Sequence, residues 1–155
     1  MILPIYTYGN AVLRKEAEEI KSDYPNIKKL IEDMYETMHH ADGVGLAAPQ
    51  IGKNIRLIVV RHKDVDLVII NPKISRKSLA KEWDEEGCLS VPGKYGQVKR
   101  HKKIYVNYLD QNGDKKKIIA EGFLARIIQH ENDHLNGILF IDRAQNLVEI
   151  NNEQN

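Results

Sequence analysis

The feature that most constrains this chain is the pattern His-Glu-x-x-His, formed by His130, Glu131 and His134. Two histidines four residues apart project from the same face of a helix and can hold one metal ion. The intervening glutamate then lies beside the ion and does not bind it. The pattern is a signature of metal hydrolases and predicts a helix from Gly122 to about Asn136 that carries a metal site. A charged, solvated helix end is the alternative interpretation.

Apolar side chains share the face of this helix with the two histidines. Phe123, Ile127, His130 and His134 are spaced four, three and four residues apart. This spacing predicts an apolar pocket beside the metal. Simple core packing is an equally good interpretation of Phe123 and of Ile127 taken singly.

Two imidazoles do not complete a catalytic site, which usually has three protein ligands and one position left for water. Cys88 is the only cysteine, so it cannot form an internal disulfide. It lies in the short segment Glu85–Ser90, where Gly87 allows close backbone approach. Buried filler is the usual role of a lone cysteine, but beside two candidate ligands we expect Cys88 to be the third.

The ligand types do not select one metal, because one thiolate and two imidazoles suit ferrous iron, zinc, cobalt or nickel. The remaining histidines have no partner at ligand spacing, and no role is assigned to them. These are His39, His40, His62 and His101.

The distribution of apolar residues predicts an α+β fold. Residues from Pro25 to Ala41 repeat at the three-and-four spacing of a helix with one buried stripe. Runs rich in β-branched residues predict strands at Arg56–Arg61, Val65–Ile70 and Lys103–Leu109. Asn112-Gly113 suits a type I′ turn into a returning strand at Ile118-Ile119. We expect antiparallel or mixed sheets around the central metal-binding helix, with the N-terminal helix packed on them.

Length and composition are those of one ordinary globular domain. The chain has 155 residues, and we expect a single catalytic domain over 1–143 and a short polar tail over 144–155 that frays from Gln145. A formal net charge of +1 gives no field that favours nucleic acid or a membrane. The amino terminus lacks the layout of a secretory signal and no apolar run is long enough to span a bilayer, so we expect a cytoplasmic protein.

Three segments of the chain together resemble the signature motifs of peptide deformylases. They are Gly43–Gln50 (GVGLAAPQ), Glu86–Ser90 (EGCLS) and Gln129–His134 (QHENDH). The resemblance extends from Pro4 to about Arg143. It implies a hydrolase that removes the N-terminal formyl group from formyl-methionyl nascent polypeptides and releases formate.

The resemblance also implies residue roles. Cys88, His130 and His134 would hold a divalent metal, ferrous iron in the native family, with zinc, nickel or cobalt as replacements, and water in the fourth position. Glu131 would act as general base and then general acid. The Gln50 side-chain amide and the Leu89 backbone N–H would stabilise the negative charge on the formyl oxygen.

Substrate binding follows from the same segments. Backbone left exposed at Gly43, Gly45 and Gly87 would let an extended peptide add as a strand. The candidates for the pocket that receives the methionine side chain are Val44, Phe123 and Ile127.

The chain departs from the family at two places. Asn132 replaces a residue that is often apolar, and the polar tail replaces a longer carboxy-terminal helix that bacterial members frequently have. The resemblance makes the ribosome a candidate partner, but docking through such a helix is not expected of this chain. We also expect Arg100 to pair with Asp133 as a brace behind the metal ligands.

Two other classes of protein stay open at this point. A zinc endopeptidase of the His-Glu-x-x-His type would need a downstream third ligand, and only Glu149 and Glu153 could serve. A non-catalytic protein with a structural metal site would need a fourth protein ligand.

Overall fold

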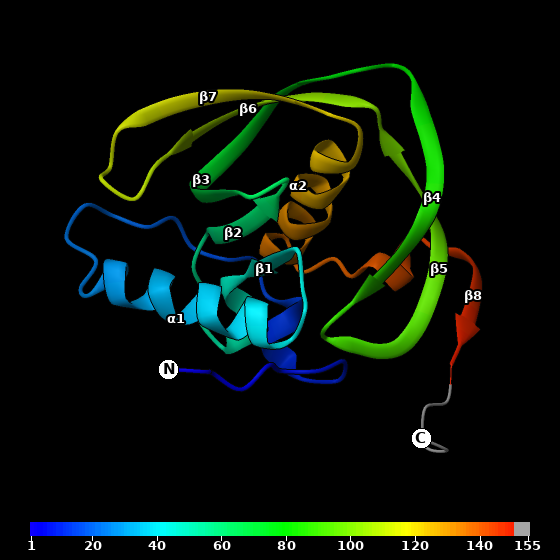
Figure 1. The fold of residues 1–155 in the computed structure, drawn as a ribbon, viewed down its shortest axis with the longest axis horizontal. Helices are drawn as coiled ribbons and strands as arrows, with labels where there is room; N and C mark the ends of the chain where they lie inside the picture. The colour runs from blue at the N-terminus through cyan, green and yellow to red at the C-terminus, as the bar shows by residue number, and fades with distance from the viewer. Residues whose placement is uncertain (151–155) are drawn as a thin grey trace.

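The computed structural model describes residues 1–150 and has the expected α+β architecture (Figure 1). Neither helix of this part of the chain is long and apolar enough to cross a membrane. Short 3-10 helices lie at Ala11–Arg14, Ala48–Ile51 and Phe140–Asp142. The remaining elements are α1 (Ile27–His40), β1 (Gly45–Ala47), β2 (Leu57–His62), β3 (Val65–Lys77), β4 (Lys81–Cys88), β5 (Val91–His101), β6 (Lys103–Leu109), β7 (Lys115–Glu121), α2 (Gly122–Leu135) and β8 (Gln145–Glu149).

The larger sheet is antiparallel, has the order β1-β2-β3-β6-β7, and is covered on both faces near β2. Successive strand residues point to opposite faces. Ile58 and Val60 pack in the core that includes α2, whereas Leu57 and Val59 pack against α1. All four are fully buried, which explains why the sequence of β2 is a continuous apolar run instead of an alternating one. The packing of the N-terminal helix on the sheet is therefore confirmed.

The smaller sheet has the order β4-β5-β8 and was only partly expected. Strand β8 pairs with β5, for example Tyr95 with Val148. The prediction that the chain frays from Gln145 was therefore wrong for residues 145–149, and residues 151–155 lie outside the described residues. Backbone pairing with β5 holds this segment although every side chain in it is exposed.

Helix α2 lies between the two sheets, as Figure 1 shows. Ala125 and Ile128 face the larger sheet and belong to its core. On the other side, Arg126 donates hydrogen bonds to the backbone oxygens of Val98 and Glu82, in β5 and β4. The metal-site helix is therefore fixed from two directions, as a rigid site requires.

The predicted hairpin between β6 and β7 is present, but the predicted type I′ turn was wrong. Gly113 has φ +82°, whereas Asn112 is not among the residues with positive φ, and a type I′ turn needs both. The Gly113 N–H donates to the Asp110 carbonyl, and the Asp110 side chain accepts from the N–H groups of Asn112 and Asp114. The Asp110 side chain thus stabilises a longer loop closed by a left-handed glycine.

Gly137, just after α2, provides a test of the packing at the end of the helix. It has φ +73°, and a Cβ there would lie 2.6 Å from the Arg14 carbonyl oxygen. We expect Gly137→Ala to lower the free energy of unfolding by about 2–4 kcal/mol, from backbone strain and overpacking together. Gly113→Ala is the control, because its φ is similar but a Cβ meets no atom within 4 Å. Equal losses for the two variants in urea unfolding would contradict this account.

Candidate active site

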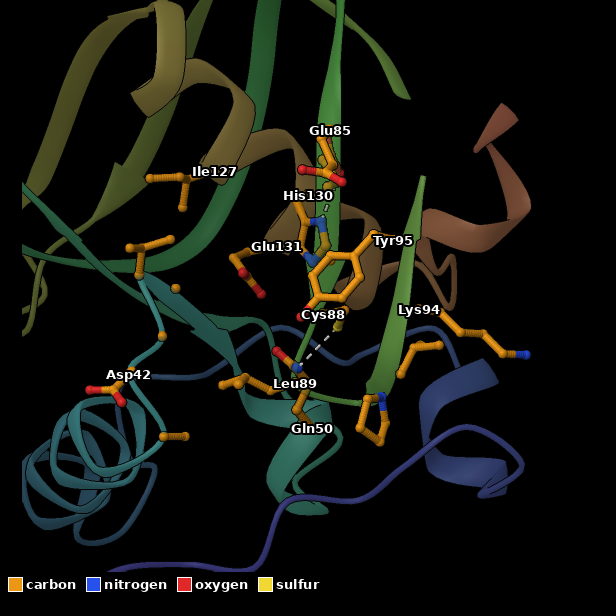
Figure 2. Close-up of a pocket in the computed structure, with 18 of the residues that line it drawn as sticks. Asp42, Gln50, Glu85, Cys88, Leu89, Lys94, Tyr95, Ile127, His130 and Glu131 are labelled. Carbon is orange, nitrogen blue, oxygen red and sulfur yellow. Dashed lines mark hydrogen bonds and ion pairs between the residues drawn. The ribbon is translucent and has the colours of Figure 1, made fainter. Parts of the chain in front are cut away.

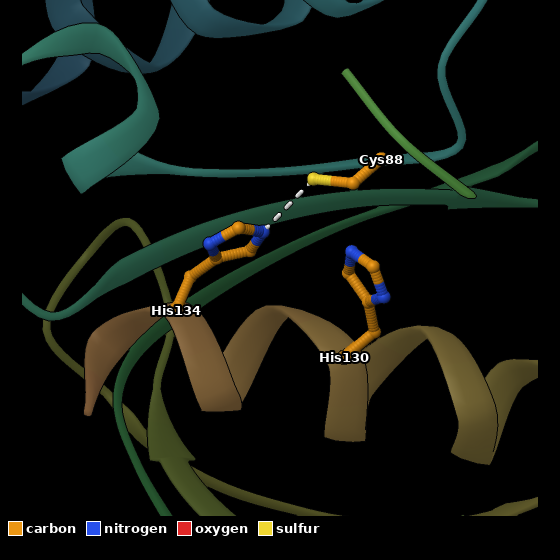
Figure 3. A group of neighbouring side chains, drawn as sticks. All are labelled: Cys88, His130 and His134. Atoms are coloured by element: carbon orange, nitrogen blue, oxygen red, sulfur yellow. Dashed lines mark hydrogen bonds between the residues drawn. The ribbon is translucent and has the colours of Figure 1, made fainter. Parts of the chain in front are cut away.

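The three expected metal ligands converge (Figure 3). One ligand atom each from Cys88, His130 and His134 lies within 4.8 Å of the other two. The Cys88 Sγ is 3.3 Å from the His134 Nε2. The helix supplies both imidazoles from one face, and the carboxyl end of β4 supplies the thiol. The group can therefore hold one metal ion, as the sequence predicted.

The chemistry of these residues fits a divalent ion. His134 is almost fully buried, and its Nε2 is the ring nitrogen that faces the Cys88 thiol, at 3.3 Å. A thiolate and imidazoles are ligands that iron, zinc, cobalt and nickel accept. Among residues 1–150 the group has three protein donors, the number typical of a catalytic site, whereas a structural site usually has four.

Glu86, which the sequence did not single out, orients one of the ligands. Its carboxylate accepts from His130 Nδ1 at 2.9 Å, from Arg100 at 2.9 Å and from Arg126 at 2.6 Å. Burial raises the pKa of Glu86, but the hydrogen bonds from His130 and Arg100 outweigh it and hold the pKa below its ordinary value. A carboxylate behind a ligating histidine fixes the ring and leaves its other nitrogen free for the metal.

Asp133 continues this charged cluster on the side away from the cleft. The expected pairing with Arg100 is present, at 2.6 Å, and Arg143 contacts the same carboxylate at 2.7 Å. Arg100 therefore joins Glu86 and Asp133, one carboxylate on β4 and one on α2. Whether this contact braces the metal ligands stays a prediction.

A cleft of about 560 Å³ opens beside the ligands (Figure 2). Cys88 and His130 line it, and so does every residue that the sequence nominated for catalysis or substrate binding, namely Gln50, Leu89, Glu131, Gly43, Val44, Gly45, Gly87, Phe123 and Ile127. Of the ligands, His134 lies behind the cleft wall. The apolar candidates differ in burial, since Ile127 is buried whereas Val44 and Phe123 are exposed at the cleft.

Glu131 faces the cleft from α2. It is 5% exposed, and its Oε1 has no hydrogen-bond partner in the described residues. Burial raises the pKa of this carboxyl to about 7. A buried oxygen without a partner is costly, and such groups gather where a ligand or water completes the site.

Gly45 leaves space for Glu131, which the sequence did not predict. A Cβ at Gly45 would lie 2.7 Å from the Glu131 Oε2 and 3.0 Å from Ile127 Cγ2. Gly45 itself is buried, so the expectation that its backbone is exposed was wrong. Gly43 and Gly87 are partly exposed.

Gln50 is held in place by hydrogen bonds at both ends of its carboxamide. Its Oε1 accepts from the Ala47 N–H at 2.9 Å, and its Nε2 lies 3.1 Å from Ser90 Oγ and 3.6 Å from Cys88 Sγ. An isolated glutamine in a glycine-rich segment would ordinarily be an exposed loop residue, yet Gln50 is 1% exposed. The carboxamide N–H₂ therefore points toward the Ser90 hydroxyl and the thiol of the candidate ligand Cys88.

The remaining histidines are not part of the ligand group. His101 Nδ1 lies 2.7 Å from the Ser78 carbonyl, and the His62 ring lies beside Phe123. Glu149, the alternative third ligand of an endopeptidase, is an exposed residue of β8 and is not in the group either. Glu153 lies outside the described residues.

The fold and the site define a class of protein: an α+β metallohydrolase with a two-histidine, one-cysteine ligand set. The polypeptide deformylase family profile matches residues 2–149. The chain belongs to this family.

Known peptide deformylases resemble this chain in sequence and in structure over most of its length. A peptide deformylase of Carboxydothermus hydrogenoformans is 49% identical and covers 95% of this chain and 96% of its own, and one of Prochlorococcus marinus is 46% identical over 97% of this chain and 77% of its own. The crystal structure of peptide deformylase from Thermotoga maritima superposes with a TM-score of 0.91 at 43% identity, covering 94% of this chain and 99% of its own. The crystal structure of a peptide deformylase from Synechococcus elongatus in complex with actinonin has a TM-score of 0.89 and a sequence identity of 46%. It covers 93% of this chain and 79% of its own.

Arg100→Ala tests the cluster behind the ligands. Arg100 is 4% exposed, and its removal leaves the buried Glu86 and Asp133 carboxylates without one of their cations. We expect a loss of about 3–5 kcal/mol in the free energy of unfolding and a lower metal content. Arg61→Ala, which breaks an exposed pair with Asp66, is the control. If Arg100→Ala kept the metal content and the rate of formate release of the wild type, Arg100 would not brace the metal ligands.

Gly45→Ala tests the steric role of the glycine. The added methyl group would displace the Glu131 carboxylate, so we expect kcat to fall about a hundredfold while metal content is retained. Gly113→Ala is the control, because a Cβ there meets no atom within 4 Å and Gly113 does not line the cleft. Wild-type kcat in Gly45→Ala would show that Glu131 does not depend on this space.

Proposed function

We propose that the cleft removes the formyl group from formyl-methionyl nascent polypeptides by hydrolysis that depends on a divalent metal, releasing formate. Membership of the deformylase family supplies the reaction. The observation that carries the assignment of roles is Glu131, a buried carboxylate with an unpartnered oxygen, in a cleft lined by Cys88 and His130. An endopeptidase role is not supported, because the third donor is Cys88 and not a downstream residue.

Cys88, His130 and His134 would hold the ion. When bound there, a divalent metal supplies Lewis-acid chemistry that makes water a usable nucleophile near neutral pH. Ferrous iron is the ion expected from the family, and zinc, nickel or cobalt suit the same donors. Glu86 would keep the His130 ring in the orientation that presents Nε2 to the ion.

Glu131 would move the proton. It would accept a proton from the attacking water as the new C–O bond forms at the formyl carbon. It would then deliver that proton to the amine nitrogen as the C–N bond breaks, which leaves formate and a free amino terminus. Its position on α2, one residue after the ligand His130, keeps this carboxylate next to the reacting atoms.

Gln50 and the Leu89 backbone would stabilise the charge that develops on the formyl oxygen. The Gln50 carboxamide is preorganised by Ala47 and Ser90, and its N–H₂ points toward Cys88. Donors fixed in advance cost no reorganisation during the reaction, and each is typically worth about 3 kcal/mol.

The peptide would bind as an added strand. β1 and β4 are each the last strand of their sheet, and residues of both line the cleft. An extended chain between these two edges would form main-chain hydrogen bonds near Gly43 and Gly87, which recognise any sequence. Val44, Phe123 and Ile127 would receive the methionine side chain.

Two broader assignments follow from the substrate. Nascent formylated chains are available at translation, so we propose a cytoplasmic location. Contact with the ribosome would bring the enzyme to these chains. Neither proposal depends on a carboxy-terminal helix.

Anaerobic purification with metal analysis, followed by assay of formate release from formyl-Met-Ala-Ser, tests the function. We expect about one divalent ion per chain, mainly iron, and a loss of at least about a hundredfold in kcat for Glu131→Gln with the metal retained. Glu85→Gln, on the exposed rim of the cleft, is the matched control and should keep wild-type kcat. Formate release by metal-free protein, or full activity of Glu131→Gln, would refute the proposal.

A further inference from the structure

We propose that a second surface of this chain, the outer face of β3, β6 and β7, binds RNA. We call this surface the cationic face. It consists of Lys73, Arg76, Lys103, Tyr105, Lys115 and Lys117.

Strand alternation places these side chains on one face. In β6, Ile104 and Val106 are fully buried in the core shared with α2, so Tyr105 between them points away from it. Arg76 of β3 and Ile119 of β7 are the register partners of Tyr105. By the same alternation, Lys103, Lys115 and Lys117 project on the Tyr105 side, and Lys73 and Lys117 flank Asn107.

Three cations surround the ring of Tyr105. The Arg76 Cζ lies 5.3 Å from the ring centroid, the Lys103 Nζ 5.6 Å and the Lys117 Nζ 5.9 Å. Contact with one aromatic ring brings three like charges together, and the ring offsets only part of their repulsion. An anionic ligand would lower the electrostatic energy of this arrangement.

The positive charge of the cationic face is poorly neutralised. Lys103 pairs with Glu121 at 3.3 Å, whereas Lys73, Arg76, Lys115 and Lys117 form no ion pair within residues 1–150. The five cations and Lys116 stand against Glu121, the nearby Glu19 and Asp110, the ion-pair partner of Lys116, so six positive and three negative charges give +3 for this region. Since the whole chain carries +1, all other residues sum to −2. The positive charge is therefore concentrated on one face of the protein, although the net charge of the whole chain is only +1.

The chemistry favours a nucleic acid over other polyanions. Sheets that bind single-stranded RNA use an aromatic ring on which a base stacks, with lysine and arginine around it for the phosphates. A groove of about 510 Å³ has Lys73, Lys115 and Lys117 of this face in its lining, together with Asn107 and the acidic Glu19. Lys117 belongs both to this lining and to the group of cations around the Tyr105 ring. Membrane binding would need apolar side chains to insert, and Ile119 is the one exposed large apolar residue among the outward residues of β6 and β7.

The cationic face and the cleft are separate. None of the six residues lines the cleft. In Figure 1 the closed end of the β6–β7 hairpin points away from β4 and β5. RNA could therefore be bound while the cleft acts on a peptide.

The test measures binding of a fluorescently labelled single-stranded RNA of about 20 nucleotides by fluorescence anisotropy, from 50 to 200 mM salt. With five phosphate contacts, we expect affinity to fall about a hundredfold over this range, with a slope of about −3.5 in log Kobs against log salt. The variant is Lys73→Gln/Arg76→Gln/Lys117→Gln. The control is Lys15→Gln/Lys28→Gln/Lys53→Gln, which removes three exposed charges elsewhere.

We expect the face variant to bind at least about tenfold more weakly at 50 mM salt, with a slope smaller by about 2, and the control to bind like wild type. Both should release formate at the wild-type rate, which shows that they are folded and separates this proposal from the deformylase assignment. If the triple variant unfolds, Lys117→Gln alone should change the slope by about 0.7. Equal RNA binding by variant and control would overturn the proposal. So would no RNA binding by wild type up to about 100 µM protein, or binding to phosphatidylserine vesicles but not to RNA.

Discussion

The structure depends on one buried carboxylate. Glu86 lies at the end of β4, is 7% exposed, and accepts hydrogen bonds from Arg100 on β5 and from Arg126 and His130 on α2. Moving a carboxylate out of water costs several kcal/mol unless it is paired and hydrogen-bonded, and these partners meet that requirement. Because they come from both the smaller sheet and the helix, the interaction that satisfies Glu86 also fixes the distance between β4 and α2. That distance decides whether the Cys88 thiol meets the two imidazoles.

The cleft follows from the same arrangement. The larger sheet ends at β1 and the smaller sheet at β4, and α2 between them supplies the floor with His130 and Glu131. Gly45 allows β1 to approach the helix closely enough to contact the Glu131 carboxylate, since any side chain there would occupy the space of that group. The proposed catalytic groups are therefore carried by rigid elements, and the edge strands β1 and β4 beside them are where we propose that the peptide binds.

The sequence alone was sufficient to predict those parts of the fold and of the site that depend on the spacing of nearby residues. The two histidines four residues apart, the apolar periodicity of α1 and the β-branched run of β2 each predicted their element, and the motif segments predicted that Cys88 would join the ligands. The smaller sheet was harder, because β4 and β8 are rich in charged and polar residues and are held by backbone pairing. The role of Glu86 and the reason for Gly45 depend on contacts between distant segments, which no local pattern reports. The net charge of the chain was equally uninformative about the cationic face, because strand alternation gathers its lysines and arginine on one side.

All of these arguments meet in one claim, that a sulfur from β4 and two nitrogens from α2 hold a single ion. X-ray absorption spectroscopy of the zinc-loaded protein measures this directly. The structure predicts one Zn–S distance of about 2.3 Å and two Zn–N distances of about 2.0–2.1 Å. A spectrum without a sulfur ligand, or with two or more, would contradict the account.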